Sequence, residues 1–401
     1  MYKLTGKVQH YTWGGTAYIP ELLGVDNPEP KPFAEYWMGA HPSNPSLIEQ
    51  DEQTTISLGE LIHQNPSKYL GEKVAEQFSA LPFLFKVLDV KEMLSIQVHP
   101  TKEEAIKGFA RENEAGIPLS ASHRNYKDDN HKPEVMVALS EFWLLHGFKE
   151  RALLMETLQQ IPELNILIRV FEKGGYYGLY KYVMELPQEK VDEMLSPLLK
   201  KIMPEYAANK LTRSNPAYWA CKAIAPNSDK YRNIDRGIFS VYFFNIVQLH
   251  PGQAIFQGAG VPHAYLEGQN IELMSNSDNV LRGGLTPKHI DVPELLKHTL
   301  FEGITPHILN GETHGAETIY HCPVPDFVVS KIELTKNGTF THDASSAEIL
   351  IVTEGESTCR SNGKELMLGK GEAAFASAGE QYTITSPSRS VLFKAAVPGE
   401  K

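Results

Sequence analysis

The sequence predicts a mainly β protein with a helical insertion: two β-barrel or jelly-roll domains plus an α-helical domain. Three observations predict this fold class. Short apolar runs bounded by Pro and Gly fill both ends of the chain, and apolar residues spaced by three and four fill its middle. The phrases LHPGQAIFQGAGVPHAYLEG and LMLGKGEAAFASAGEQYTI also share one rhythm, which indicates a duplicated β unit.

The first two regions differ in the period of their apolar residues. In residues 1–150, FLFKVLDV (83–90) and LSIQVHP (94–100) predict strands, and PEVMVALSEFWLLHG (133–147) predicts two strands joined by a turn. In residues 151–235, RALLMETLQQI, GGYYGLYKYVMEL and QEKVDEMLSPLLKKIM have the spacing of amphipathic helices. The proline and acidic residues of LPQEKVDE mark a helix start.

The remainder of the chain returns to strand patterns. IFSVYFFNIVQLHPGQAIF (238–256) predicts two strands around a Pro-Gly turn, and GAGVPHAYLEGQNIELM (258–274) predicts two more. Residues 325–401 carry short strands with Gly-rich turns, which indicate a second small barrel. We therefore expect a discontinuous catalytic domain (1–150 and 236–324), a helical insertion (151–235) and a non-catalytic C-terminal β domain (325–401).

Composition excludes several classes of protein. The 401 residues are 42% hydrophobic and carry a net charge of −11, which argues against a nucleic-acid surface but allows a small anion bound by a few local cations. No run approaches the roughly 20 apolar residues of a membrane span, and the N-terminus lacks a secretory signal. Three widely spaced cysteines predict reduced thiols in the cytoplasm, so a metal would need nitrogen and oxygen ligands.

Two motifs offer such ligands on predicted strands. In LSIQVHP, strict alternation directs Gln97 and His99 to one face, where both could reach one ion. A solvent-facing polar side is the alternative. In HKPE, Lys132 and Glu134 share a face if the segment is extended. The alternative there is an edge strand with a surface ion pair, since Pro133 suits an edge.

A third motif completes a mixed nitrogen and oxygen set. In GVPHAYLEG, His263 follows a Gly-Pro turn and shares a face with Tyr265, although a histidine after a turn is more often a surface residue. Two histidines, a glutamate and a glutamine suit zinc, which accepts imidazole and carboxylate at roughly 2.0–2.2 Å. Manganese or cobalt would also fit such a site.

The segment IELMSNSDNVLRGGLTPKHID (271–291) is rich in residues for anion binding and proton transfer. Glu272 and Asp278 are candidate bases, and Arg282 and Lys288 are candidate cations for a phosphate or an oxyanion. The paired glycines after the arginine would allow a ligand to approach the backbone. A turn with a structural ion pair is the alternative. Lys86 is a charge inside an apolar strand, so it either faces water at the strand end or lines a polar cavity.

Taken in chain order, these motifs resemble the type I phosphomannose isomerase family. The matching segments span residues 11 to 291 and are YTWGG, EYWMGAHPS, PFLFKVLD, LSIQVHP, HKPE, GVPHAYLEG and DNVLRGGLTPKHID. The resemblance implies a cupin-type catalytic barrel, a helical insertion and a second cupin-like domain. It implies an aldose–ketose isomerase that interconverts mannose 6-phosphate and fructose 6-phosphate through a cis-enediol, feeding mannose precursors or glycolysis.

The resemblance also implies roles for individual residues. One zinc ion per chain would be bound by Gln97, His99, Glu134 and His263, with Arg282 as the catalytic arginine. The substrate pocket would be lined by Lys86, Ser95, Lys132, Tyr265, Glu272 and Lys288. Lys132 could shuttle a proton between the substrate oxygens. The base stays open between Glu272, Asp278 and, behind them, His131.

Two rival functions remain at this stage. A dioxygenase or another sugar isomerase could use the same barrel, but a fourth ligand and the cations favour a phosphosugar. A sugar-binding protein without catalysis should lack buried cations and a metal. The C-terminal region contains a single histidine, His342, so it cannot repeat the same metal site. We expect a monomer or weak homo-oligomer whose partner is a small phosphosugar, with no nucleic acid and no membrane.

Overall fold

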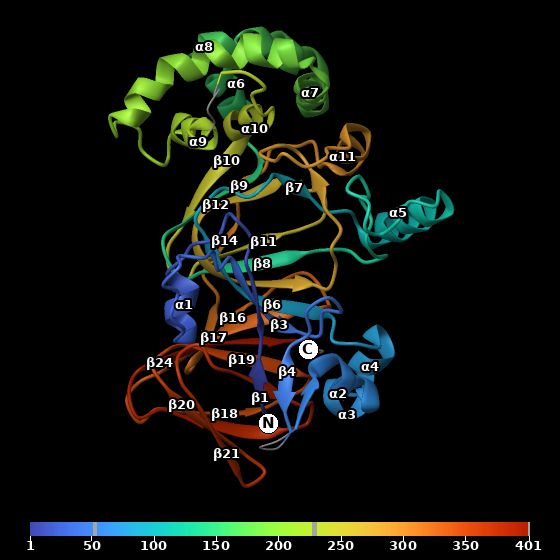
Figure 1. Cartoon of the computed structure of the whole chain (residues 1–401), viewed down its shortest axis with the longest axis vertical. Coiled ribbons are helices and arrows are strands. Elements are labelled where there is room, and N and C mark those ends of the chain that lie inside the picture. The colour runs from blue at the N-terminus through green and yellow to red at the C-terminus, as the bar shows by residue number, and fades with distance from the viewer. Residues whose placement is uncertain (51–53, 227–230, 400–401) are drawn as a thin grey trace.

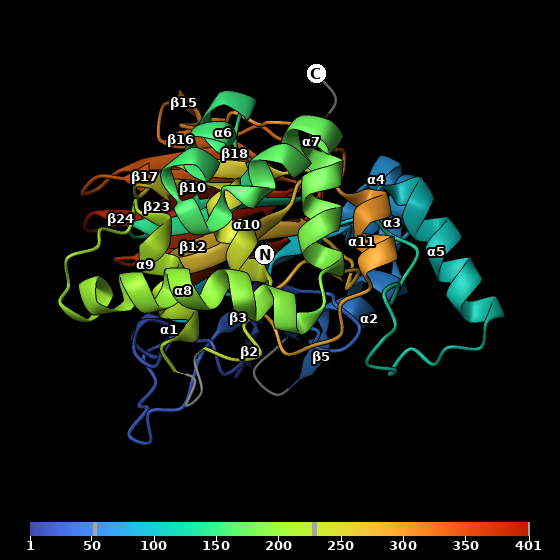
Figure 2. The ribbon, with the colours of Figure 1, turned by 90° about the horizontal axis from the view of Figure 1, so that it is seen from above.

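The structure is a computed structural model that describes residues 1–50, 54–226 and 231–399. The molecule is elongated, with helices at one end, an eleven-stranded sheet in the middle and the C-terminal strands at the other end (Figure 1). Seen from the helical end, α6 to α10 cover the strands below them (Figure 2). Among the described helices, none combines the length and the apolar character that a membrane span needs.

The eleven-stranded sheet, here called the first barrel, contains the strand order β14-β11-β8-β12-β6-β3-β2, with β7, β9, β10 and β13 attached around β12. All its pairings are antiparallel. Its strands are β2 (Lys7–Gln9), β3 (Glu35–Gly39), β6 (Phe83–Val90), β7 (Gln97–Val98), β8 (Glu134–Ala138), β9 (Phe142–Phe148), β10 (Phe244–Leu249), β11 (Ala254–Gln257), β12 (His263–Ser275), β13 (Leu281–Arg282) and β14 (Ile308–Leu309).

The C-terminal strands form a nine-stranded and a four-stranded sheet, here called the second barrel. The nine-stranded order is β15 (Glu312–His314), β16 (Glu317–Tyr320), β17 (Val328–Leu334), β24 (Ser390–Ala396), β19 (Glu348–Glu354), β22 (Ala373–Ala376), β1 (Tyr2–Thr5), β4 (Leu47–Glu49) and β5 (Thr55–Ser57). The four-stranded order is β18 (Thr339–Asp343), β23 (Gln381–Thr385), β20 (Ser357–Ser361) and β21 (Lys364–Leu368). The N-terminal strands β1, β4 and β5 therefore extend a sheet made of C-terminal strands. The domain limits expected from the sequence stay a prediction.

Half of the described helices lie between β9 and β10. They are α6 (Arg151–Gln160), η1 (Pro162–Leu164), α7 (Ile166–Glu185), α8 (Gln188–Ala207), α9 (Pro216–Ile224) and α10 (Gly237–Phe243). Outside this insertion lie α1 (Tyr18–Leu23), α2 (Leu58–Gln64), α3 (Pro66–Leu70), α4 (Glu72–Phe78), α5 (Lys102–Glu114) and α11 (Val292–His298). The three predicted helices are confirmed, and α8 follows Pro187 with an acidic residue in its first turn, as expected.

Three strand predictions were wrong in detail. Residues 238–243 form part of helix α10, because a short apolar run is equally compatible with a buried helix and all seven α10 residues are buried. Residues 258–274 contain one long strand, β12, which bends at Gly268 (φ +130°) where a second strand was expected to begin. In the segment 94–100, the regular strand is confined to Gln97–Val98.

The predicted duplication appears in the strand order. The run β11-β8-β12-β6-β3-β2 of the first barrel recurs as β22-β19-β24-β17-β16-β15 in the second. Likewise β7-β12-β9-β10 matches β18-β23-β20-β21, because the first half of β12 pairs with β7 and β9. In the second barrel a tight turn at Asn362 and Gly363 joins β20 to β21. The helical insertion replaces that turn in the first barrel.

The two barrels share one apolar core. Alternation along β6 turns Phe83, Phe85 and Val87 toward β-strand residues of the second barrel such as Ile349 and Phe375, all fully buried in one cluster. The opposite faces of the same strands line the inside of the first barrel. A second cluster joins the helical insertion to β7, β9 and β12. The first barrel is therefore packed against apolar residues on both sides.

Candidate metal centre and substrate cavity

The interior of the first barrel carries a cluster of charged side chains. Strand β12 lies between β6 and β8, so Glu272 stands opposite Lys86 on one side and Met136 on the other. Since neighbours of Glu272 on the same strand, such as Ile271 and Leu273, belong to the shared apolar core, alternation directs Glu272 and Lys86 inward. The same alternation on β8 directs Glu134 inward.

Three potential metal ligands meet at one end of this interior. The donor atoms of His99, Glu134 and His263 all lie within 4.8 Å of one another, and all three residues are buried. The two carboxylate oxygens of Glu134 face different imidazoles: Oε1 lies 3.5 Å from His99 Nε2, and Oε2 lies 3.3 Å from His263 Nε2. The alternatives that placed these residues at the surface are therefore excluded.

The imidazoles are oriented for a cation. His99 Nδ1 donates to the carbonyl of Asn279 (2.8 Å), and His263 Nδ1 donates to the carbonyl of Val261 (2.9 Å). A proton on Nδ1 leaves the lone pair of Nε2 pointing into the cluster, and His99 Nε2 has no hydrogen-bond partner among the described residues. An orphaned buried nitrogen beside a carboxylate fits a divalent metal ion, and imidazole with carboxylate suits zinc.

Gln97 lies next to these residues by strand pairing. On β7 it stands opposite His263 of β12 on one side and opposite Arg282 of β13 on the other. Directly opposed residues of antiparallel strands share a face, so the three side chains emerge together. Gln97 also lines the same cavity as Glu134 and His263. Its place in the ligand set stays a proposal.

Electrostatics favour an ionised carboxylate and neutral imidazoles here. Burial lowers the pKa of His99 to about 4, so its ring is neutral near pH 7. Burial would raise the pKa of Glu134, but the cation of Lys132, 3.3 Å from Oε1, holds it well below its usual value. A deprotonated Glu134 with neutral histidines is the state that binds a metal cation.

Beside the metal ligands lies a buried ion triad. Lys86 Nζ is 2.8 Å from Glu272 Oε2 and 3.5 Å from Glu35 Oε2. Burial would lower the pKa of Lys86, but these two carboxylates outweigh it and raise that pKa. Burial raises the pKa of Glu272. Of the two alternatives for Lys86, the structure shows the polar cavity and not the exposed strand end.

The triad lines one small cavity of about 60 Å³ together with Glu134 and His263. Its lining residues are Glu35, Lys86, Leu88, Leu94, Gln97, Lys132, Glu134, His263, Ala264, Tyr265 and Glu272. Tyr265 accepts a hydrogen bond from Gln257 Nε2 (3.3 Å), and burial raises its pKa well above the usual value. The cavity thus combines a metal site with cations, a carboxylate and a phenol, which suits a polar substrate.

Arg282 is a half-buried cation at the rim of this cluster. Among the described residues, no carboxylate pairs with its guanidinium, and burial lowers its pKa. The following glycines pack against protein rather than leaving room for a ligand. A Cβ on Gly283 would lie 2.6 Å from Tyr180 Oη, and one on Gly284 would lie 2.5 Å from Gly237 Cα. Close approach of a ligand to this backbone stays a prediction, and the packing of the two glycines limits the space around Arg282.

Besides Arg282 and the metal-site residue His99, four predicted site residues lie outside the cavity lining. Asp278 is about half exposed and pairs with His41 Nε2 (3.4 Å), and Lys288 is exposed. His131 turns to Asp326, whose Oδ1 lies 2.9 Å from its Nε2. Ser95 is half-buried in the segment before β7. The structure therefore brings Lys132, Tyr265 and Glu272 together with the metal ligands and leaves these four at a distance or at the rim.

Two residues near the site were missed by the sequence analysis. Glu35 belongs to the segment EYWMGAHPS, but nothing in a short apolar run showed that its carboxylate meets Lys86. Asn279 supports the loop behind His99: its Oδ1 accepts from the amides of Lys127 (2.7 Å) and Asp128 (3.2 Å). Its position directly after Asp278 in the dense polar segment was the only available signal.

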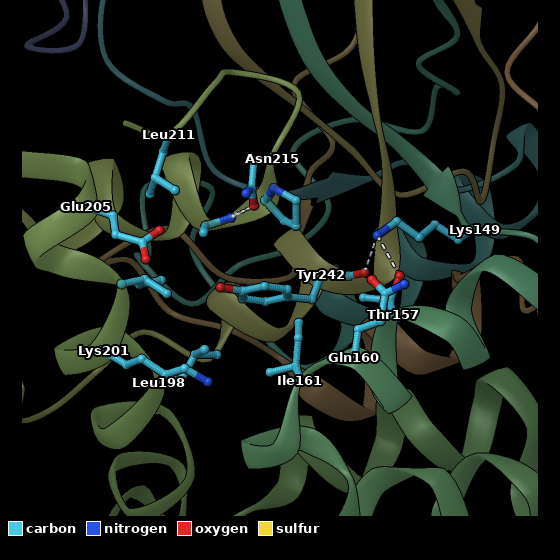
Figure 3. Close-up of a pocket in the computed structure, with 13 residues that line it drawn as sticks. Lys149, Thr157, Gln160, Ile161, Leu198, Lys201, Glu205, Leu211, Asn215 and Tyr242 are labelled. Carbon is cyan, nitrogen blue, oxygen red and sulfur yellow. Dashed lines mark hydrogen bonds between the residues drawn. The ribbon is translucent and has the colours of Figure 1, made fainter. Parts of the chain in front are cut away.

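A larger cavity, of about 410 Å³, lies in the helical insertion and is distinct from this site (Figure 3). Tyr242 separates Lys149 on one side from Glu205 on the other. Lys149 Nζ donates to the carbonyl of Tyr242 (2.8 Å) and to Thr157 Oγ1 (3.2 Å), and burial lowers its pKa to about 8. No histidine lines this cavity, so it lacks the donor set of a zinc site.

Comparisons with known proteins agree with this geometry. Residues 1–151 match the model of the phosphomannose isomerase type I catalytic domain, and residues 316–391 match that of the mannose-6-phosphate isomerase cupin domain. The chain is 39% identical over 388 residues to mannose-6-phosphate isomerase of Escherichia coli K12, covering 95% of each chain, and 34% identical to that of Macaca fascicularis, covering 98% of each. A crystal structure of the Salmonella typhimurium enzyme, bound to fructose 6-phosphate and zinc, superposes with a TM-score of 0.88 at 38% identity over 100% of both chains.

Proposed function

The chain belongs to the type I phosphomannose isomerase family, and from that premise we propose that it interconverts mannose 6-phosphate and fructose 6-phosphate with one zinc ion. The convergence of His99, Glu134 and His263 beside the Lys86–Glu272 pair carries this proposal. The same side chains would hold zinc together with Gln97, the neighbour of His263 across the strands. When bound, zinc would supply positive charge beside the substrate oxygens.

Moving a carbonyl from C1 to C2 requires one base and positive charge near the two oxygens. A proton leaves C2, a cis-enediol forms, and a proton is added at C1. Of the three candidate bases, Glu272 is the one that lines the cavity, and burial raises its pKa toward the range useful for proton transfer. Asp278 pairs with His41 and has a lowered pKa, while His131 faces Asp326. We therefore assign the base to Glu272.

The cations have separate tasks in this proposal. Lys132, beside Glu134, moves a proton between O1 and O2 of the enediol. Arg282 lacks a carboxylate partner among the described residues, so its charge is available for the developing oxyanion. Lys288, exposed beyond the rim, offers a cation for the substrate phosphate. Lys86 holds Glu272 in place, with Ser95 and Tyr265 contacting sugar hydroxyls.

A coupled assay for fructose 6-phosphate formed from mannose 6-phosphate tests the function. We expect turnover in the zinc-loaded protein, loss of turnover after dialysis against a chelator, and recovery when zinc is added. Undiminished turnover in protein shown to be metal-free would refute the role of zinc. Oxygen uptake on addition of a sugar, without formation of fructose 6-phosphate, would point instead to the rival oxygenase chemistry.

We further propose the domain division and the cellular setting. A discontinuous catalytic β domain would be interrupted by the helical insertion between β9 and β10 and followed by a non-catalytic C-terminal domain, an arrangement that the repeated strand order supports. The odd, widely spaced cysteines support a cytoplasmic protein. A monomer or weak homo-oligomer that supplies mannose precursors or glycolysis completes the proposal, and gel filtration with light scattering tests the oligomeric state.

A further inference from the structure

The repeated strand order allows residues of the two barrels to be matched one by one. Two positions fix the alignment. Gly260 (φ +80°) and Gly379 (φ +75°) close equivalent turns, and each donates its backbone N–H across the barrel. Gly260 donates to the carbonyl of His99 (2.9 Å), and Gly379 donates to the carbonyl of Ala344 (2.7 Å). The second barrel therefore has Ala344 where the first has the proposed ligand His99.

Strand pairing extends the match to two further ligand positions. His263 lies three residues after Gly260, and Tyr382 lies three residues after Gly379. His263 stands opposite Gln97 of β7, and Tyr382 stands opposite His342 of β18. In the second barrel a tyrosine thus replaces His263, and His342 occupies the position of Gln97.

The glutamate ligand is retained. Glu134 begins β8 and stands opposite Gln257, the last residue of β11. Glu348 begins β19 and stands opposite Ala376, the last residue of β22. Glu348 is therefore the counterpart of Glu134, and like Glu134 it is buried.

The buried ion triad is only partly retained, because its lysine stands on a different strand and Ser330 takes the position of Lys86. Glu272 lies opposite Lys86 across β12 and β6, and its counterpart Lys394 lies opposite Ser330 across β24 and β17. Each faces the residue two positions after the ligand glutamate on the neighbouring strand. The lysine has moved from β6 to the counterpart of β12, and the carboxylate Glu317, on β16, remains at the position that Glu35 has on β3.

The displaced lysine contacts the counterparts of the metal ligands. Lys394 Nζ lies 3.1 Å from His342 Nε2, 2.9 Å from Glu317 Oε1 and 3.8 Å from Glu348 Oε1. His342 Nε2 lies 3.0 Å from the same Glu348 oxygen, and Tyr382 donates to the other oxygen at 2.7 Å. The ammonium group thus lies against the donor atoms that correspond to Gln97 and Glu134.

We propose that the second barrel holds a degenerate copy of the metal site, in which the ammonium of Lys394 takes the place of a divalent metal ion. Two buried carboxylates, Glu317 and Glu348, need a compensating cation, and the lysine supplies it permanently. Loss of both histidines that correspond to His99 and His263 leaves too few ligands for zinc. The inference rests on the proposed ligand set of the first barrel and assigns a latent divalent-cation site to the second.

The test removes the ammonium and restores one ligand. In Lys394→Met/Tyr382→His, the carboxylates lose their cation and gain a nitrogen donor, so we expect zinc to bind in the second barrel. The native protein should retain one zinc per chain after gel filtration, and the double variant two. Its melting temperature should fall without zinc and recover with it. Lys370→Met, which removes an exposed lysine paired with Glu21, is the matched control and should show neither effect.

Tyr382→His alone separates the role of the lysine from that of the added ligand. Because Lys394 still occupies the site, this variant should hold only one zinc; a second ion bound beside the lysine would overturn the proposal. The double variant overturns it too if its circular dichroism is native and it holds a single zinc. If the double variant folds only in the presence of zinc, the proposal is supported. If it fails to fold in either condition, the zinc content of Tyr382→His decides.

Removing the metal ligands of the first barrel distinguishes this proposal from the proposed function. With His99→Ala/His263→Ala added, the first barrel should hold no zinc, so the Lys394→Met/Tyr382→His variant should fall from two ions to one. If the native protein holds no zinc at all, the proposed function fails. The comparison of variants with and without Lys394 still measures binding in the second barrel.

Discussion

Replacing Asn279 by leucine tests how strongly the loop behind His99 determines the metal site. Asn279 is fully buried, and its amide Nδ2 donates to the carbonyls of Asp128 and Asn130, at 2.8 Å each. Its Oδ1 accepts from two backbone amides, and its own carbonyl accepts from His99 Nδ1. Leucine has a similar branched shape but is larger, and it leaves the carbonyl of Asp128 and the amides of Lys127 and Asp128 without their side-chain partner.

The expected loss follows from the number of groups left unpaired. Two part-buried backbone amides lose their acceptor at roughly 1–3 kcal/mol each, so we expect Asn279→Leu to lower the free energy of unfolding by about 3 kcal/mol. Because the carbonyl that orients His99 moves with the loop, zinc affinity should fall about 10- to 100-fold. Urea unfolding of the zinc-loaded and metal-free proteins measures the first effect, and competition with a chromophoric chelator measures the second.

Asn270 provides the matched control. It is also fully buried, lies on β12 and has no hydrogen-bond partner for either side-chain atom among the described residues. Asn270→Leu adds the same volume without breaking a hydrogen bond, so it should lower the free energy of unfolding less than Asn279→Leu does and leave zinc affinity unchanged. Equal destabilisation by the two substitutions would refute the reasoning, because it would show that burial and not hydrogen bonding sets the loss.

Four further substitutions test the proposed chemistry and the helical insertion. Arg282→Gln should lower kcat about 100- to 1000-fold with zinc content unchanged, and normal kcat in the coupled assay would remove Arg282 from the reaction. Glu272→Gln should lower kcat at least about 100-fold while Asp278→Asn keeps most of it; the reverse order would move the base to Asp278. Lys149, with a usual pKa of 10.5 lowered to about 8, binds its proton less readily in the folded than in the unfolded chain. Stability should therefore rise from pH 8 to 10.5, by up to about 3 kcal/mol for this group, and urea titrations of Lys149→Met should show that rise reduced and greater stability at pH 7.

The sequence was most informative where one periodicity dominates. Strand β6 was predicted with its observed limits, because the mostly apolar run of residues 83–90 lies between Pro82 and the charged Lys91. Helix α8 was predicted because its start signal and its apolar spacing agree. Helix α10 was predicted as strand, since a run such as Ile238–Phe243 is buried on every side and periodicity cannot distinguish the two.

The sequence likewise revealed the site residues that follow a local pattern and missed those that depend on pairing between distant strands. Alternation placed Gln97 and His99 on one face, and the structure adds what no local pattern contains: the register that sets Gln97 opposite His263. The partners of Lys86 come from β3 and β12, far from it in the chain, so Glu35 could not be found from sequence. The same holds for the displaced lysine Lys394, whose match to Glu272 depends on the pairing between β17 and β24.

Diffraction at the zinc absorption edge from crystals grown with zinc tests the central claim most directly. We predict one anomalous peak per chain, inside the first barrel, with Gln97, His99, Glu134 and His263 at roughly 2.0–2.2 Å and no sulfur ligand. Density between Glu348 and His342 of the native protein should belong to the Lys394 ammonium and give no peak. An anomalous peak in the second barrel, or none between His99 and His263, would contradict the account.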